Sequence, residues 1–138
     1  MLNENFNKII EDFDYIDEWE DKYRYIIDLG KKLDDMKEEL KTDANKVDGC
    51  ASQVWISYEK KEEHGEENIF FSGDSDAIIV KGLIAIVFSL YQGLSIKDAK
   101  KIKPKEELKK LGLNNYLSSQ RSNGLFSMLK QIEIILSK

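Results

Sequence analysis

Residues 77–94, "AIIVKGLIAIVFSLYQGL", constrain the fold more than any other stretch, because almost every position is apolar. A helix that is apolar on all sides has to be surrounded by protein or by lipid. The length approaches the ~20 residues of a membrane span, but Lys81 and the lack of flanking basic anchors favour a helix buried in a protein core. We expect Asp74 or Asp76 to cap this central helix and Gly93 to close it.

The N-terminal part of the chain has an amphipathic pattern. Apolar residues recur mostly every three or four positions, which predicts two helices, or one bent helix, within residues 3–29. Gly30 is the expected end signal. The charged stretch 31–49 that follows has few apolar anchors, and we expect it to form an extended or partly helical connection.

A β-hairpin is predicted in the middle of the chain. Residues 54–59 alternate with a period of two, and the apolar stretch 68–73 follows a charged turn at 60–67. A two-stranded hairpin is seldom stable alone, so a third strand is expected, for which the weak stretch 45–47 is the available candidate.

The C-terminal third is predicted to be helical. A capping-box pattern at Ser95 and a proline suited to a first turn indicate short helices over 96–102 and 104–111. The apolar stripe in residues 125–136 predicts a terminal helix of about four turns. Strands grouped between helical runs favour an α+β fold in which helices cover a small three-stranded antiparallel sheet, formed by residues 1–138 as a single domain.

Charge and cysteine content exclude several classes of function. The net charge of −5, with no basic stripe, disfavours nucleic acid as a partner. The acidic N-terminus does not resemble a secretory signal or a transit peptide, so we expect a cytoplasmic protein with no membrane association. A single cysteine cannot form an internal disulfide or supply the ligands of a zinc or iron–sulfur site, and no phosphate-binding glycine loop is present.

Cys50 is the strongest candidate for chemistry, because a thiolate is the most nucleophilic group available near neutral pH. Gly49 allows the backbone to turn, and Ala51 and Ser52 add little bulk beside the sulfur. The competing interpretation is a small buried structural residue in a non-catalytic interaction module, since free cysteine is often buried.

A cysteine hydrolase is poorly supported by the sequence. The one histidine, His64, lies among glutamates in the charged turn, where a solvated surface residue is expected, whereas a hydrolase needs a base beside the thiol. A thiol without its own base can still accept a group from an activated donor if a nearby cation favours the thiolate. We nominate Arg121, just before the predicted terminal helix, as that cation.

Four blocks of the sequence resemble the SufE family of sulfur-acceptor proteins, in the family's order and with matching spacing. They cover most of the chain: "DEWEDKYRYIIDLG" (17–30), "VDGCASQVW" (47–55), "GDSDAIIVKGLIAIV" (73–87) and "LSSQRSNGLFSML" (117–129). The resemblance implies two N-terminal helices, a three-stranded antiparallel sheet and further helices.

The resemblance also implies a function in sulfur transfer. Cys50 would take a sulfane sulfur from the persulfide of a cysteine desulfurase of the SufS or CsdA type, stimulate that enzyme, and deliver the sulfur to an iron–sulfur scaffold complex. The pyridoxal phosphate belongs to the desulfurase, so no cofactor is expected here. The chain would be a carrier without independent turnover, and both a monomer and a homodimer are compatible with the sequence.

Position by position, Asp76 and Arg121 match family positions linked to the cysteine loop, and Gly49, Ser52 and Gln53 belong to the cysteine motif. Ala51 departs from the glutamine that is common in the family. The resemblance further implies that the thiol faces an apolar cavity and swings out on docking. We therefore expect Cys50 to be largely covered in the free protein.

Overall fold

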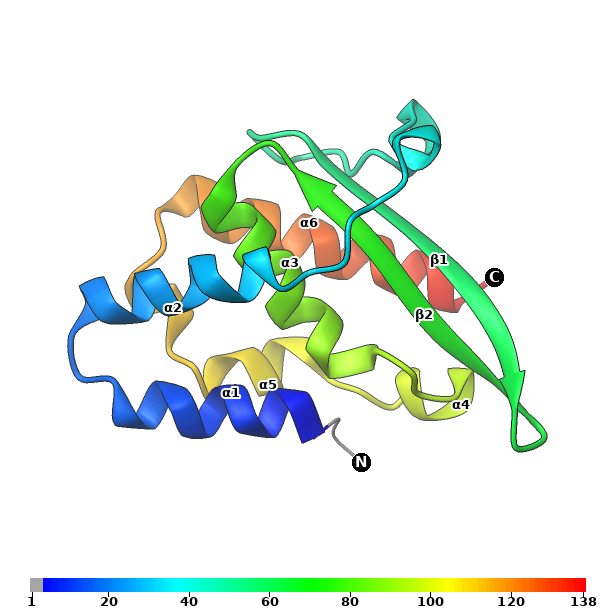
Figure 1. The fold of residues 1–138 in the computed structure, drawn as a ribbon, viewed down its shortest axis with the longest axis horizontal. Helices are drawn as coiled ribbons and strands as arrows, with labels where there is room; N and C mark the ends of the chain where they lie inside the picture. Colours follow the sequence, from blue (N-terminus) through cyan, green and yellow to red (C-terminus); the bar gives the residue numbers. More distant parts are fainter. Residues whose placement is uncertain (1–3) are drawn as a thin grey trace.

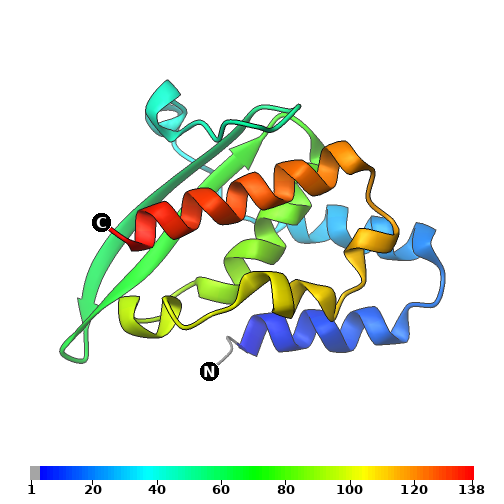
Figure 2. The same ribbon diagram turned by 180° about the vertical axis from the view of Figure 1, so that it is seen from behind.

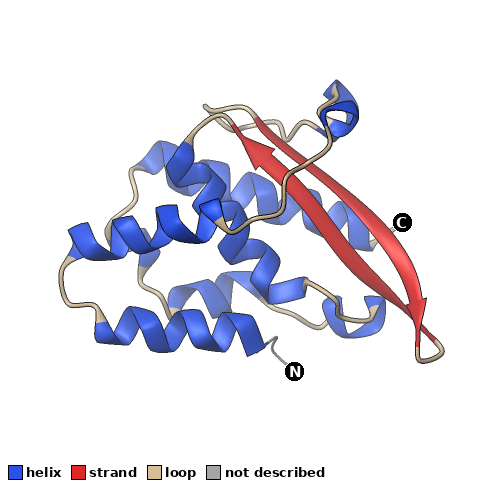
Figure 3. Cartoon of the chain, in the orientation of Figure 1, coloured by secondary structure: helices blue, strands red, loops and turns tan. Residues whose placement is uncertain are grey.

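The computed structural model describes residues 4–138 as helices packed on one side of a long hairpin (Figures 1 and 3). The helices and strands follow in the order α1 (Glu4–Tyr15), α2 (Trp19–Lys31), β1 (Val54–Glu63), β2 (Glu66–Ser75), α3 (Ile78–Tyr91), α4 (Ile96–Ala99), α5 (Pro104–Lys109) and α6 (Ser119–Leu136). Short 3₁₀ turns η1 (Glu38–Leu40) and η2 (Asp43–Asn45) interrupt the charged connection, and η3 (Leu113–Asn115) precedes α6. The two N-terminal helices and the α+β class are confirmed.

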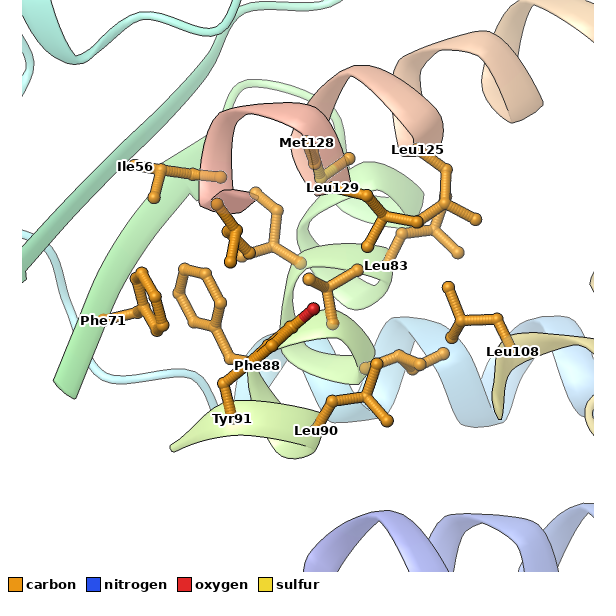
Figure 4. Packing of buried hydrophobic residues seen from close by; sticks show 14 of the residues in the cluster. Ile56, Phe71, Leu83, Phe88, Leu90, Tyr91, Leu108, Leu125, Met128 and Leu129 are labelled. Carbon is orange, nitrogen blue, oxygen red and sulfur yellow. The ribbon is translucent and has the colours of Figure 1, made fainter. Parts of the chain in front are cut away.

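Helix α3 lies at the centre of the molecule, between α2 and α6 (Figures 1 and 2). Ten of its 14 residues are buried, which confirms the predicted buried helix. Figure 4 shows its side chains meeting those of the hairpin, α5 and α6 in one apolar cluster. Over residues 4–138 no helix combines the length and the apolarity that crossing a bilayer requires.

The predicted start of α3 is wrong in detail. Ala77 occupies the N-cap position and no side chain caps the helix. Asp74 lies instead in β2, and Asp76 bonds to the cysteine loop. The predicted end is confirmed, since Gly93 follows the last turn with a φ of +80° that favours glycine.

Helices α2 and α3 come closest where Gly30 of α2 meets Gly82 of α3. A Cβ on Gly82 would lie 2.1 Å from the carbonyl oxygen of Ile26, and a Cβ on Gly30 would lie 2.7 Å from the backbone nitrogen of Gly82. Gly30 is therefore part of α2 rather than its end signal, because the helix continues to Lys31. The two missing side chains allow the backbones to touch.

The hairpin is longer than the sequence pattern predicts. Strands β1 and β2 pair antiparallel from Val54↔Ser75 to Glu63↔Glu66, so most of the charged stretch 60–67 is strand. Only His64 and Gly65 form the turn, with φ of 53° and 79°. Positive φ at both positions is typical of the tight turns that connect paired strands.

The expected third strand is absent from the described residues, which contain a two-stranded sheet. Near the candidate stretch there is one isolated bridge, Lys46↔Trp55, with a hydrogen bond from the Val47 N–H to the Val54 carbonyl at 2.8 Å. The 3₁₀ turn η2 ends just before this bridge and the Gly49 turn follows it, so the chain has no room for a longer ladder. The helices cover the hairpin instead.

The C-terminal helices follow the predictions more closely. The Ser95 hydroxyl caps α4 by accepting from the Asp98 N–H at 3.1 Å, and Pro104 is the first residue of α5. Helix α6 has 18 residues, which is about five turns rather than the four predicted. It begins at Ser119 because the Ser118 hydroxyl caps it and accepts a hydrogen bond from the Arg121 N–H. Arg121 thus lies in the first turn of α6, not before the helix.

Candidate functional site

The loop that carries Cys50 is held against α6. Gly49 has a φ of +87°, and a Cβ at this position would lie only 2.5 Å from the Ser127 hydroxyl oxygen. Both the left-handed backbone and the close contact require glycine. The turn brings Cys50 from the connection after η2 to the first half of α6.

The Cys50 thiol is half-buried at the edge of a small cavity. Its S–H donates to the Gly124 carbonyl at 3.5 Å, and a Cβ on Gly124 would lie 3.6 Å from the sulfur. The cavity has a volume of about 160 Å³ and is lined by Cys50, Ala51, Ser52, Ala77, Ile79, Val80, Leu83, Gln120, Arg121, Gly124 and Met128. Cys50 is therefore only partly exposed, which agrees with the expected shielding of the thiol without full burial.

The surroundings of Cys50 favour the neutral thiol. Burial raises the pKa of Cys50, and the negative charge of Asp48 raises it further. In the free protein the sulfur is consequently a poorer nucleophile near neutral pH than an exposed cysteine. A cation brought close to it, or its movement into solvent, would favour the thiolate.

Asp76 and Gln53 fix the end of the cysteine loop to the start of α3. Asp76 Oδ1 accepts from the Gln53 N–H at 3.0 Å, and the Asp76 N–H donates to the Gln53 carbonyl at 3.3 Å. The structure thus brings Gly49, Cys50, Ser52, Gln53 and Asp76 into one loop region, with Ser52 lining the cavity.

Arg121 reaches the same cavity from the first turn of α6. Its guanidinium carbon lies 5.8 Å from the ring centroid of Tyr23, a cation–π arrangement. Tyr23 in turn contacts Trp19 edge to face, and Trp19 stacks on Tyr116 with 4.3 Å between ring centroids. Sequence reasoning missed this aromatic support, because Tyr23 and Trp19 fit the apolar stripe of α2 and Tyr116 lies outside any predicted helix.

The charge of Arg121 is not neutralised by a carboxylate among residues 4–138. Arg121 is exposed and forms no ion pair within the part of the chain that the structure describes. Arg121 and Cys50 line the same cavity, but burial and Asp48, not Arg121, set the pKa of the thiol in the free protein.

Asp74 joins three segments of the chain and does not line the Cys50 cavity. It forms ion pairs with Lys41 at 2.8 Å and Lys81 at 3.5 Å, which join the connection before β1 to β2 and α3. Burial by itself would raise the pKa of Asp74, but hydrogen bonds from Lys41 and from the Ser75 N–H hold it below its usual value. The lone charge of Lys81 in an apolar helix was the sequence signal that a carboxylate partner lies nearby.

His64 is remote from Cys50. It lies at the hairpin tip, and the nine residue steps from Val54 to Glu63 separate the two ends of β1 by roughly 30 Å. A Cys–His pair is therefore not formed. No group of three or more potential metal-ligating side chains occurs in residues 4–138.

Comparison with known proteins gives consistent matches. The family model "SufE: Fe-S metabolism associated domain" matches residues 7–135. An uncharacterized SufE-like protein of Rhizobium meliloti is 45% identical over 94% of this chain and 92% of its own length. Another from Rhizobium etli is 48% identical over 93% of this chain and 86% of its own length.

A solved structure supports the fold independently. The solution structure of a hypothetical protein from Thermus thermophilus superimposes with a TM-score of 0.75, covering 99% of this chain and 96% of that one. The two sequences are 15% identical, so this likeness concerns the fold alone.

Proposed function

The chain belongs to the SufE family, which is associated with iron–sulfur metabolism, and from that premise we propose that it carries sulfur as a persulfide on Cys50. The sulfur donor would be a pyridoxal-phosphate cysteine desulfurase, which the chain also stimulates, and the recipient an iron–sulfur scaffold complex. The observation that carries the proposal is the Cys50 thiol at the edge of a cavity, hydrogen-bonded to a backbone carbonyl.

The chemistry requires one thiolate and one good leaving group. The Cys50 thiolate attacks the outer sulfur of the desulfurase persulfide, a new S–S bond forms on Cys50, and the old S–S bond breaks. The electron pair of the broken bond leaves with the desulfurase cysteine as a thiolate. No net oxidation occurs, and no resident acid–base pair is needed, which agrees with the remote position of His64.

The cavity supplies shelter for the product. Its volume of about 160 Å³ exceeds the roughly 30 Å³ share of a water molecule in the liquid, so a second sulfur atom can be accommodated. The apolar side chains of Ile79, Leu83 and Met128 line it and limit access by water and by soluble thiols. A persulfide held there is protected from reduction and further oxidation between encounters.

The raised pKa of Cys50 supports a role for the partner in activating the thiol. The thiol stays protonated in the free protein, and attack begins when docking moves the loop or brings a cation to the sulfur. Gly49 gives this loop its backbone turn, Asp76 anchors its end through Gln53, and Arg121 provides a cation of this chain at the cavity.

The direct test measures sulfide or alanine release by a purified desulfurase with free cysteine and a reductant. Addition of the native chain should stimulate the reaction, and Cys50→Ser should abolish the stimulation while leaving the fold intact. Stimulation retained by Cys50→Ser would instead identify the chain as a non-catalytic interaction module. Hydrolysis of a thioester without any desulfurase would identify a thiol hydrolase.

A further inference from the structure

A large groove lies on a different side of α6 from the Cys50 cavity. It has a volume of about 1210 Å³ between α6 and the chain that runs from α4 into α5. Figure 2 shows these segments side by side on this face of the molecule. At about 100° per residue, Phe126, Lys130 and Ser137 project from a different face of α6 than Arg121 and Gly124.

The groove has an apolar floor with two uncovered side chains. Tyr91, Ala99, Leu129 and Leu136 are buried beneath it. Phe126 and Ile134, which lie about two helical turns apart on the same stripe of α6, are 37% and 45% exposed. Large apolar side chains gathered in one concave surface are typical of a binding site.

The rim of the groove is positively charged. Lys100, Lys103, Lys105 and Lys130 line it, against two carboxylates, Glu106 and Glu133. None of the four lysines forms an ion pair with any residue from 4 to 138, and the one ring contact among them is Lys105 Nζ, 5.3 Å from the Phe126 ring centroid.

This charge contrasts with the rest of the chain. Residues 97–110 contain seven lysines and three carboxylates, a net charge of +4, in a protein of net charge −5. The remaining sequence therefore carries a net charge of −9. A basic groove on an acidic protein selects an acidic occupant and repels basic ones.

The dimensions of the groove suit a polypeptide segment. Its volume exceeds the roughly 300–1,000 Å³ of small-molecule pockets. Its wall on α6 runs from Phe126 to Ser137, about 16 Å or three helical turns. An amphipathic helix can place one apolar stripe on such a floor while its polar face meets the rim.

We propose that this groove binds an acidic amphipathic helix of a partner protein, with apolar side chains of that helix on Phe126 and Ile134 and its carboxylates beside the four lysines. The inference goes beyond the proposed function because it does not involve Cys50. Ser127 nevertheless lines the groove and contacts the Gly49 turn, so a bound helix lies next to the cysteine loop.

The test uses two synthetic helical peptides of about 15 residues with leucine at every third or fourth position. One carries glutamate at the remaining positions, and the other carries lysine. Each is titrated into the full chain and followed by calorimetry and by backbone amide shifts in NMR. The glutamate peptide should bind at least tenfold more tightly than the lysine peptide, shift amides in α5 and along residues 126–137, and lose affinity as salt is added.

Charge reversal locates the binding. Lys103→Glu with Lys105→Glu should weaken the glutamate peptide tenfold or more, and Phe126→Ser should weaken both peptides. The matched control, Lys37→Glu with Lys46→Glu, makes the same charge change at exposed lysines outside the groove. Circular dichroism confirms that each variant is folded, and Cys50→Ser should bind like the native chain.

Equal binding of the two peptides, shifts confined to another surface, or equal effects of the two charge reversals would overturn the proposal. It is also overturned if the free chain forms a dimer that Lys103→Glu with Lys105→Glu dissociates, since the occupant would then be a second copy. If neither peptide binds but the native chain still accepts sulfur on Cys50, the groove proposal fails and the proposed function of Cys50 is unaffected.

Discussion

Asp76 and Gln53 exchange two hydrogen bonds, at 3.0 and 3.3 Å, across the gap between the cysteine loop and the start of α3. The pair links the most mobile type of element, a glycine-containing loop, to the most buried helix of the protein. The position of the Cys50 thiol therefore depends on the packing of the core.

Replacing Asp76 tests this link. Asp76→Ala removes the acceptor of the Gln53 N–H, but Asp76 is exposed and water can replace it, so the loss in unfolding free energy should stay below about 1 kcal/mol. The loop should loosen, and the rate of Cys50 alkylation should rise severalfold. Asp35→Ala, at an exposed aspartate outside this loop, is the control, and equal alkylation rates in both variants would disprove the anchoring role.

Arg121→Ala should reduce desulfurase stimulation without reducing stability. The side chain is exposed, and its backbone bond to Ser118 survives the substitution, so the unfolding free energy should change by less than about 0.5 kcal/mol. Tyr23→Leu, which removes the ring beneath the guanidinium, should cause a smaller loss of stimulation. Arg24→Ala serves as the matched control, and a loss equal to that of Arg121→Ala would argue against a specific role for Arg121.

Gly124→Ala should separate stability from sulfur transfer. The new Cβ would meet the Cys50 sulfur at 3.6 Å, an ordinary contact, and alanine is favoured over glycine in a helix by about 1 kcal/mol. The protein should be as stable as the native chain or more so. The methyl group occupies space beside the thiol that a second sulfur needs, so stimulation should fall. Native stimulation in this variant would mean that the persulfide does not use the cavity.

Gly82→Ala, in contrast, should destabilise the protein. Its Cβ would meet the Ile26 carbonyl oxygen at 2.1 Å, and backbone cannot move aside without separating α2 from α3. We expect a loss of about 3 kcal/mol in urea unfolding. Gly124→Ala is the control for adding the same methyl group within a helix, and equal stabilities of the two variants would contradict the close helix crossing.

The pH dependence of alkylation tests the electrostatics of the site. Burial and Asp48 both raise the pKa of Cys50, so the alkylation midpoint of the native chain should lie above that of the same chain in denaturant. Asp48→Asn removes the negative charge and should move the midpoint toward lower pH, giving faster alkylation near pH 7. A native midpoint at or below the denatured one would show that the thiolate is already stabilised in the free protein.

Local patterns in the sequence predicted most helices correctly. The apolar run of α3, the Ser95 cap and the proline of α5 are each decided within a few residues, and the structure confirms them. The third strand was wrong because pairing depends on how the chain approaches β1, and η2 and the Gly49 turn shorten that approach. Gly30 was misjudged because its close contact with Gly82 is a tertiary feature.

The local features of the site could likewise be predicted from the sequence, and its tertiary contacts could not. Cys50 and its motif could be nominated from the sequence, since a loop glycine and small neighbours are local signals. The bonds of Asp76 to Gln53 and the ring of Tyr23 beneath Arg121 join residues far apart in the chain, and no spacing rule places them together. The groove lined by four lysines likewise forms only when α6 packs beside the chain between α4 and α5.

The most direct measurement is intact-protein mass spectrometry of the native chain after incubation with a cysteine desulfurase and free cysteine, without reductant. We expect a gain of one sulfur atom that maps to the Cys50 peptide, disappears on treatment with dithiothreitol and is absent in Cys50→Ser. A desulfurase that forms its own persulfide while Cys50 gains no sulfur would contradict it.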